Sequence, residues 1–241
     1  MNAEEVAVSA KRPAHRFTFD HAGAPMRFLA RRLLAGGYTG RDPAAVEEHI
    51  AELALLGVPR PAHVPWIFVA NPQVLQVDGT VYAYDGTSSG EAEYVLLIDR
   101  DDVFVCIGSD HTDRGLESLS IEKSKQIYPK ILSRQIWRLD DLLPRWDDLR
   151  LRSRVGEGDE MEDYQDGTLS QLIRPERLLE LIGPDPGAGT VVFSGTLPVL
   201  GGNVRPAPRF EAELFDTDGS PLASLGYDVA VLQPQAQPDE R

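Results

Sequence analysis

The chain has one cysteine among its 241 residues, and this scarcity excludes several kinds of protein. A disulfide framework within the chain needs at least two cysteines, and a Cys-rich zinc site needs more. Cys106 itself lies in an apolar, strand-like run at 103–107, where a thiol usually packs as a small buried hydrophobic group. We therefore predict a structural role for Cys106, with a nucleophilic role as the less favoured alternative.

Positive charge is scarce as well. The sequence has 24 Lys and Arg against 38 Asp and Glu, which gives a formal net charge of −14. Such a surface repels phosphate backbones and anionic lipid, so we expect no nucleic-acid and no membrane partner. The sequence shows no apolar stretch of membrane-spanning length and no signal-peptide pattern, which predicts a cytoplasmic protein. Any anionic ligand must then be held by local Lys or Arg side chains or by a metal.

The residues that are present predict a globular domain of α+β class that is dominated by β-strands. Alternating or apolar runs predict strands at 16–19, 66–69, 149–153, 191–194, 210–215 and 225–232, and several more within 74–107. Helices are expected at 43–57, where Asp42 and Pro43 mark the start, and at 175–182. Residues 26–34 fit either a strand or a short helix, 112–130 a helix-and-loop segment, and 156–163 a solvated acidic loop.

The pattern with the most chemical content is Glu91-Ala92-Glu93, which leads into the apolar run 94–98. Residues i and i+2 of a strand share one face, so both carboxylates would leave the same side. Asp110 follows the apolar run 103–107 and could approach them from a neighbouring strand. Three such carboxylates would suit a hard, oxygen-preferring cation such as Mg²⁺. Taken alone, the Glu-x-Glu pattern more often marks a solvated strand face.

Several short motifs occur in one order along the chain, and in that order the chain resembles the fumarylacetoacetate hydrolase superfamily. The resemblance covers about residues 36–232 and implies a mixed β-sheet, β-roll core with peripheral helices. It implies a catalytic domain at 36–232, preceded by an N-terminal segment at 1–35 that is short for the family, and the Pro/Gln-rich composition of 233–241 predicts a disordered tail. The motifs are His49-Ile50-Ala51-Glu52, Pro65-Trp66-Ile67-Phe68, Glu91-Ala92-Glu93, Asp110-His111-Thr112-Asp113-Arg114, Lys123-Ser124, Gln165-Asp166-Gly167-Thr168 before Pro175-Glu176, and Ser194-Gly195-Thr196.

The resemblance implies an enzyme with Mg²⁺ or Mn²⁺ held by Glu91, Glu93 and Asp110. Its substrate would be a small 2-oxo or 1,3-dicarbonyl acid of the acylpyruvate type, and the metal would stabilise an enolate as a C–C bond is hydrolysed. A decarboxylase, hydratase or dehydratase of 2-oxo acids on the same scaffold is one alternative, and a non-catalytic ligand-binding module is another. Relatives usually pair, so the resemblance also implies a homodimer.

The resemblance further assigns His49 as the general base that activates water, oriented by Glu52 on the same helix. Two residues three apart on a helix also form ordinary surface pairs, which is the structural alternative.

Four more residues receive roles near the substrate. Lys123 would polarise a carbonyl or bind a carboxylate, and Lys125 competes for that role because the register of Lys123-Ser124-Lys125 is open. Arg114 would either contact the substrate or pin the Asp110 segment through a salt bridge. Thr196 would offer its hydroxyl and backbone N–H to a substrate carboxylate, or would simply end a strand.

The chain departs from the family pattern at three places. Asn71-Pro72 stands where a Lys-Pro is usual, and His111 and Asp113 stand where the family usually has an apolar and a small residue. The stretch from Arg41 to His49 is also longer than usual. These departures affect the expected substrate more than the expected fold, and they leave the part of His111 and Asp113 in the site open.

Overall fold

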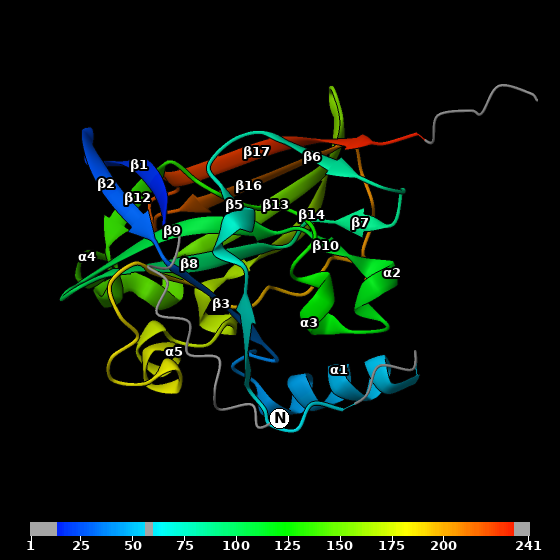
Figure 1. Ribbon diagram of the computed structural model, residues 1–241, viewed down its shortest axis with the longest axis horizontal. Helices are drawn as coiled ribbons and strands as arrows, with labels where there is room; N and C mark the ends of the chain where they lie inside the picture. Colours follow the sequence, from blue (N-terminus) through cyan, green and yellow to red (C-terminus); the bar gives the residue numbers. More distant parts are fainter. Residues whose placement is uncertain (1–13, 56–59, 234–241) are drawn as a thin grey trace, which may run out of the picture.

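The computed structural model of the protein describes residues 14–55 and 60–233, and the account below concerns these residues. Strands dominate and form two main sheets with short helices at their margins (Figure 1). The predicted α+β, β-dominated fold class is therefore confirmed. No helix in these residues is long and apolar enough to cross a membrane. Apart from Gln233, the predicted tail lies outside the described residues.

The larger sheet is mixed, and the described residues contribute ten strands to it. Strands β8 and β9 pair antiparallel at its centre, and β11 and β5 extend it from β9. In spatial order it contains β2 (Ala24–Ala30), β1 (His15–His21), β12 (Gln135–Arg138), β9 (Asp102–Asp110), β8 (Ala92–Asp99), β15 (Thr190–Phe193), β3 (Arg32–Gly37) and β4 (Trp66–Ala70), with β11 (Lys130–Leu132) and β5 (Leu75–Gln76) off this path.

The second sheet packs on the first through buried side chains. It contains β14 (Glu160–Thr168), β13 (Arg150–Glu157), β16 (Arg209–Phe215), β17 (Pro221–Val231) and β6 (Thr80–Ala83), in that order. A two-stranded pair, β7 (Ser88–Ser89) and β10 (Thr112–Asp113), lies just beyond the end of β9.

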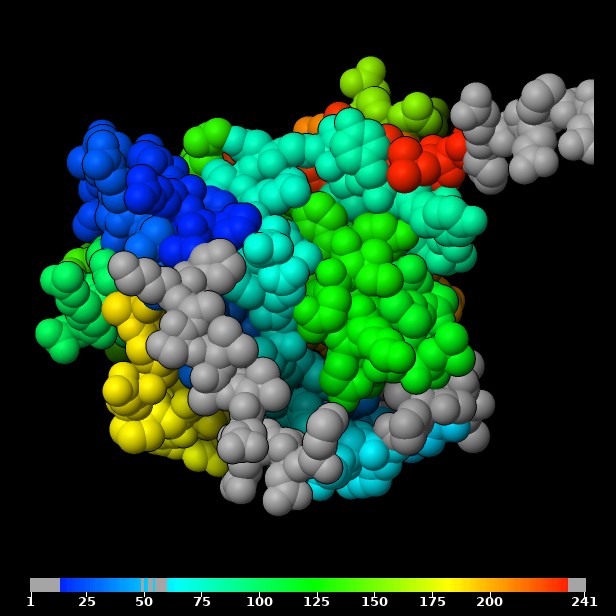
Figure 2. All heavy atoms as spheres, viewed as in Figure 1, coloured from blue at the N-terminus to red at the C-terminus, as the bar shows by residue number. Residues whose placement is uncertain are grey.

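Short helices cover the margins of the sheets. The α-helices are α1 (Pro43–Leu55), α2 (Arg114–Glu117), α3 (Ile121–Ser124), α4 (Leu139–Leu142) and α5 (Pro175–Ile182), and the 3-10 turns are η1 (Pro72–Val74), η2 (Leu143–Asp148) and η3 (Leu169–Gln171). The segment with α2 and α3 forms one surface beside β4 and β5 (Figure 2), where Gln126 accepts from the backbone N–H of Asn71 and donates to the carbonyl of Val69.

Alternation along β8 separates two apolar clusters. Tyr94 and Leu96 face the cluster between the two sheets, to which Phe210 of β16 belongs. Val95 and Leu97 face a second cluster on the opposite side of the larger sheet. Each fully buried aliphatic or aromatic side chain contributes about 1.5–3 kcal/mol relative to exposure, so both faces of β8 stabilise the fold. A strand that is buried on both faces has a continuous run of apolar residues in its sequence, and residues 94–98 form such a run.

One predicted segment is wrong. The acidic stretch 156–163 is not a loop, because β13 runs to Glu157 and β14 begins at Glu160. The acidic side chains lie on the exposed face of this hairpin, and Arg152 of β13 pairs with Asp163 of β14 across it. Opposite charges on neighbouring strands support pairing, which a count of like charges along the chain does not show.

The N-terminal strands belong to the larger sheet. β1 pairs with β12, and β3 lies between β15 and β4. The segment 26–34, for which the sequence left strand and helix open, forms parts of β2 and β3. Because β3 spans 32–37, it crosses the predicted division between 35 and 36.

Candidate active site

Three carboxylates that the sequence singles out meet at one end of β8 and β9. Glu93 lies opposite Gly108 in the ladder, and the backbone N–H of Asp110 donates to the carbonyl of Glu91 at 3.0 Å. The side chains of Glu93 and Asp110 are almost fully buried, with 2% of each residue exposed. Figure 1 shows α2 and α3 beside this end of the strands. The pairing of two central strands thus brings Asp110 to Glu91 and Glu93, which lie nineteen and seventeen residues before it in the sequence.

Asp110 is held by two buried lysines. Lys125 Nζ lies 2.6 Å from Asp110 Oδ2, and Lys130 Nζ lies 2.5 Å from Oδ1. Burial opposes ionisation of Asp110, but the two ammonium groups outweigh it and lower the pKa of Asp110. Burial opposes the charge of both lysines. For Lys125, Asp110 and other nearby carboxylates outweigh burial and raise its pKa, whereas burial lowers the pKa of Lys130.

Glu91 is paired with an arginine. Arg114 Nη2 lies 3.2 Å from Glu91 Oε2, and the same guanidinium donates to Glu117 Oε2 at 2.8 Å and to Ser89 Oγ at 2.7 Å. Burial would lower the pKa of Arg114, but Glu91 and Glu117 raise it, so the guanidinium stays charged. Arg114 therefore fixes Glu91 to α2 and β7, whereas the structural alternative predicted from the sequence was a salt bridge that pins the Asp110 segment.

Glu93 differs from the other two carboxylates. Its Oε2 accepts from the backbone N–H of Gly195 at 2.6 Å, and among the described residues it forms no ion pair. Burial, and then the charge of Asp110, raise the pKa of Glu93 well above its ordinary value. Gly195 has a φ of +91°, and a Cβ there would lie 2.0 Å from Thr39 Oγ1, so this position requires glycine.

Thr196 and Gln165 hold the segment beside Glu93 in place. Thr196 Oγ1 donates to the carbonyl of Ala92 at 3.0 Å and accepts from Gln165 Nε2 at 2.6 Å. Gln165 is fully buried and also accepts from the backbone N–H of Ala92 at 2.8 Å. The late Ser-Gly-Thr motif and the Gln165 motif are thus brought together on β8.

The donor set suits a divalent cation, but the side chains are engaged in ion pairs. Within residues 14–55 and 60–233, no three His, Cys, Asp or Glu side chains are arranged to hold a metal ion. Asp110 and Glu91 are already paired with Lys125 and Arg114. Carboxylate oxygens are nevertheless the ligands that Mg²⁺ and Mn²⁺ prefer, and Glu93 is a buried carboxylate without a cationic partner in the described contacts. The chemistry of the donors therefore fits such an ion.

Of the two lysines that the sequence left open, only Lys125 lies against the carboxylates. Lys123 is exposed on α3, and its ammonium makes no contact with the carboxylates in the described structure, whereas Lys125 is buried against Asp110. His49 and Glu52 lie on α1 as predicted, but their side chains are outside the described part of the chain.

The residues at which the sequence departs from the family pattern have structural roles. Asp113 caps α2 by accepting from the backbone N–H of Leu116, and Asn71 caps η1 in the same way. His111 points to the opposite side of β9 from Asp110, where Nδ1 lies 2.9 Å from Tyr227 Oη and Nε2 lies 2.9 Å from Ser88 Oγ. Burial, and then Lys130, lower the pKa of His111 to about 3, so the imidazole is neutral.

Sequence reasoning missed two charged members of the cluster. Lys130 reaches Asp110 because β11 pairs with β9, and Glu117 reaches Arg114 from one turn along α2. One signal for Lys130 was available, since it is a lone charged residue at the start of the apolar pair Ile131-Leu132. Such a residue is either an exposed strand end or a buried charge with a partner.

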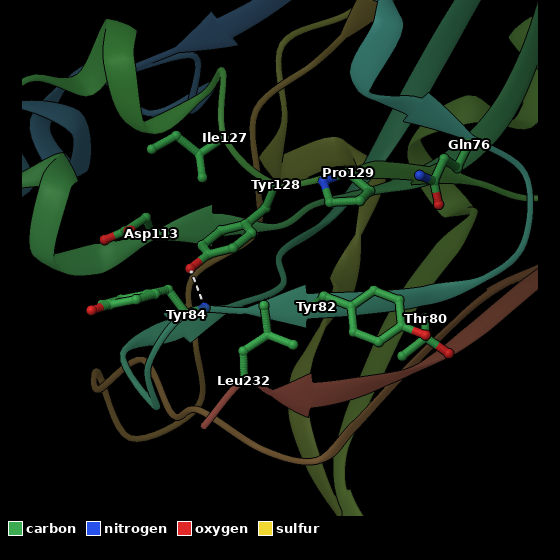
Figure 3. Close-up of a pocket in the computed structure, with 9 residues that line it drawn as sticks. All are labelled: Gln76, Thr80, Tyr82, Tyr84, Asp113, Ile127, Tyr128, Pro129 and Leu232. Atoms are coloured by element: carbon green, nitrogen blue, oxygen red, sulfur yellow. Dashed lines mark hydrogen bonds between the residues drawn. The ribbon is translucent and has the colours of Figure 1, made fainter. Parts of the chain in front are cut away.

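A separate surface groove of about 680 Å³ lies outside this cluster. Figure 3 shows Tyr128 directed at the backbone of Tyr84, whose N–H donates to the Tyr128 hydroxyl at 3.0 Å, with Tyr82 and Leu232 nearby. None of the predicted site residues lines this groove. It is therefore not where the predicted chemistry gathers.

Solved structures share this fold. Fumarylpyruvate hydrolase from Pseudomonas aeruginosa, in complex with Mn²⁺ and pyruvate, aligns with a TM-score of 0.62 and 19% identity over 91% of this chain and 98% of that one. 2-Keto-3-deoxy-D-arabinonate dehydratase, complexed with magnesium and 2,5-dioxopentanoate, aligns with a TM-score of 0.60 and 16% identity over 84% and 74%. Cg1458 with an inhibitor gives 0.63 and 18% over 86% and 81%.

These identities are low, so the similarity establishes the fold that the resemblance implied and leaves the reaction to be argued from the site. No curated protein matches the chain. A family model does match, and it spans residues 36–227. On that match, the chain belongs to the family described as "Protein of unknown function (DUF2848)".

Proposed function

We propose that this chain is a divalent-cation-dependent enzyme that hydrolyses a C–C bond in a small 2-oxo or 1,3-dicarbonyl acid. The observation that carries the proposal is that Glu91, Glu93 and Asp110 lie together at one end of the paired strands β8 and β9, with the buried Lys125 against Asp110. Two proteins of the same fold each bind a divalent cation together with a 2-oxo acid, pyruvate in one and 2,5-dioxopentanoate in the other.

Glu91, Glu93 and Asp110 would hold the cation, Mg²⁺ or Mn²⁺. When bound, it would supply Lewis-acid stabilisation of the negative charge that develops on the substrate oxygens. The buried state of Glu93 and Asp110 keeps water from screening that charge. Arg114 holds Glu91 in place, which fixes one of the three donors against α2.

The anionic substrate needs positive charge from the chain, and we assign this role to Lys125. The sequence left Lys123 and Lys125 open, but only Lys125 lies in the carboxylate cluster. The Thr196 hydroxyl already donates to Ala92, so we assign the second candidate contact for a substrate carboxylate to the backbone N–H of Thr196.

Water activation is assigned to His49, oriented by Glu52. Both residues lie on α1 at positions i and i+3, which places them on one face of the helix. Replacing His49 by Ala should lower turnover without changing cation affinity, because general-base catalysis contributes about 10²–10⁴-fold to rate. Unchanged turnover would transfer the role of base to another group.

The cation site is tested by calorimetry with Mn²⁺ and Mg²⁺ on Glu91→Ala. Loss of a direct ligand should weaken binding by more than about 100-fold, since even outer partners of a ligand are worth about 10–100-fold. Glu160→Ala, which removes an exposed carboxylate on β14, serves as the matched control and should bind normally. Full affinity in Glu91→Ala would show that the site is elsewhere.

Product analysis then separates the reactions that this scaffold could perform. Hydrolysis of an acylpyruvate yields two acids, whereas a decarboxylase releases CO₂ and a dehydratase removes water from a hydroxylated 2-oxo acid. The dehydratase is the second candidate, because a sugar-acid dehydratase shares the fold about as closely as the hydrolase does. Cation binding without turnover of any acylpyruvate, oxaloacetate-like or hydroxylated 2-oxo acid would favour a ligand-binding module.

We also propose that the chain forms a homodimer, by analogy with the implied family. Light scattering of the purified chain measures its mass directly, and a monomer at micromolar concentration would contradict this proposal.

A further inference from the structure

The two oxygens of Asp110 are taken by two different lysines, and the two lysines are held very differently. Lys130 is part of β11 and faces Asp110 in the ladder with β9. Its ammonium also donates to the carbonyl of His111, and its side chain is 3% exposed. Strand pairing and two acceptors therefore fix Lys130 in place.

Lys125 is held less firmly. It is the C-cap residue of the four-residue helix α3, and its ammonium has one close ion pair, to Asp110 Oδ2 at 2.6 Å. Thr112 Oγ1 lies at the limit of hydrogen-bond distance, 3.5 Å away. The side chain ends on a flexible four-carbon stem, so the ammonium can move while the backbone stays.

A second carboxylate lies next to the Lys125 ammonium. Glu117 Oε1 is 3.7 Å from Lys125 Nζ, which is close enough for attraction and too far for a hydrogen bond. The other oxygen of Glu117 accepts from Arg114 at 2.8 Å, which holds the carboxylate still. Burial opposes its ionisation, but Lys125 and Arg114 lower the pKa of Glu117 and keep it charged.

We propose that Glu117 is a positioning residue that receives the Lys125 ammonium when a divalent cation binds Asp110. The inference rests on the proposed function, because it requires the cation site at Glu91, Glu93 and Asp110. A divalent cation held by Asp110 would compete for Oδ2, which the Lys125 ammonium occupies at 2.6 Å. Two positive charges on one carboxylate oxygen in a buried site repel each other.

The Lys125 ammonium must then move or lose its charge. Glu117 is close enough to accept the ammonium after a small movement of the side chain. A shift of about 1 Å brings Nζ from 3.7 Å to hydrogen-bond distance from Glu117 Oε1. The ammonium stays buried and paired throughout, which avoids the large cost of an isolated buried charge. Asp110 keeps its contact with Lys130 on Oδ1, so the other oxygen becomes free for the cation.

A double-mutant cycle on the whole chain tests the exchange through Mn²⁺ affinity measured by calorimetry. Lys125→Met removes the competing ammonium and should tighten Mn²⁺ binding about tenfold, whereas Glu117→Gln removes the receiving carboxylate and should weaken it about tenfold, the scale seen for outer partners of a metal site. In the Lys125→Met background, Glu117→Gln should change affinity less than about twofold. Arg138→Met, which removes an exposed charge on β12, should bind as the parent does.

The cycle separates this exchange from simple attraction. If Glu117 only attracts the cation, Glu117→Gln weakens binding by the same factor in both backgrounds, and the inference is wrong. Native circular-dichroism spectra of the parent and the three variants of the cycle, recorded at the temperature of the calorimetry, show that unfolding does not enter the comparison.

A crystal structure with Mn²⁺ supplies the second measurement. We expect Lys125 Nζ within hydrogen-bond distance of Glu117 and away from Asp110, and Lys125 still on Asp110 Oδ2 beside the bound ion overturns the exchange. If no variant binds Mn²⁺, Lys125→Met included, the proposed cation site fails and the exchange with it. Binding by the parent chain with equal effects of Glu117→Gln in both backgrounds rejects the exchange alone.

Discussion

Replacing Asp110 by Asn should cost more stability than almost any other single change of charge in this protein. The carboxamide has nearly the same size and keeps one acceptor, so packing changes little. Lys125 and Lys130 would remain in place with their ammonium groups buried and without a counter-charge on Asp110. Removing one partner of a buried ion pair costs about 3–5 kcal/mol. Against a typical domain stability of about 5–15 kcal/mol, this is about a fifth of the total or more.

The assay is equilibrium unfolding in urea at pH 7 with a chelator present, followed by the fluorescence of the buried Trp146. Asp102→Asn is the matched control, because Asp102 pairs with Arg138 at 2.9 Å and both side chains are half exposed, at 51% and 41%. An exposed pair contributes about 0–1 kcal/mol. If Asp110→Asn loses no more stability than Asp102→Asn at an unchanged m-value, the two buried ammonium groups do not depend on Asp110 and the reasoning fails.

Two further predictions concern groups on either side of β9. His111 has a folded pKa of about 3 and protonates near 6.5 when unfolded, so the unfolded state binds more protons between these pH values and the free energy of unfolding falls as pH is lowered from about 6.5 to 3. His111→Gln should flatten this part of a urea-unfolding series, and an unchanged slope contradicts the assignment. Gly108→Ala should lower stability by about 1–3 kcal/mol, since the new Cβ would lie 2.6 Å from the Phe193 ring. Phe193→Leu should restore part of the loss in melting temperature, and no loss in Gly108→Ala would show that the ring moves freely.

The strands of the fold could be predicted where burial leaves a pattern in the sequence. The apolar runs 94–98 and 103–107 became β8 and β9, and the helix expected at 175–182 is α5 with Pro175 in its first turn. The hairpin of β13 and β14 was missed at 156–163, because its stability comes from partners across the ladder. The residues of one strand taken alone do not show which residues of the other strand will pair with them.

The candidate site also has residues that the sequence could predict and residues that only the structure reveals. Strand alternation predicted one shared face for Glu91 and Glu93, with Asp110 approaching from a neighbouring strand. The pairing of β8 with β9 brings the backbone of these three residues to one end of the sheet, while their role as metal ligands stays a prediction. Lys130 and Glu117 reach the cluster through the β11–β9 pairing and the packing of α2, which local sequence does not specify. The choice between Lys123 and Lys125 depended on the direction in which α3 turns a side chain, and only three-dimensional structure decides that.

The placement of Asp110 and His111 on opposite sides of β9 makes the site sensitive to strand register. A slip of one residue would turn every side chain of the strand over. It would drive a carboxylate toward Tyr227 and Ser88 in the space between the sheets, and it would leave Lys125 and Lys130 facing an imidazole. Both outcomes are unfavourable, so electrostatics and packing each disfavour a one-residue slip in the register of β9. Grafting this chemistry onto another sheet would therefore require both faces of the strand to be transferred together.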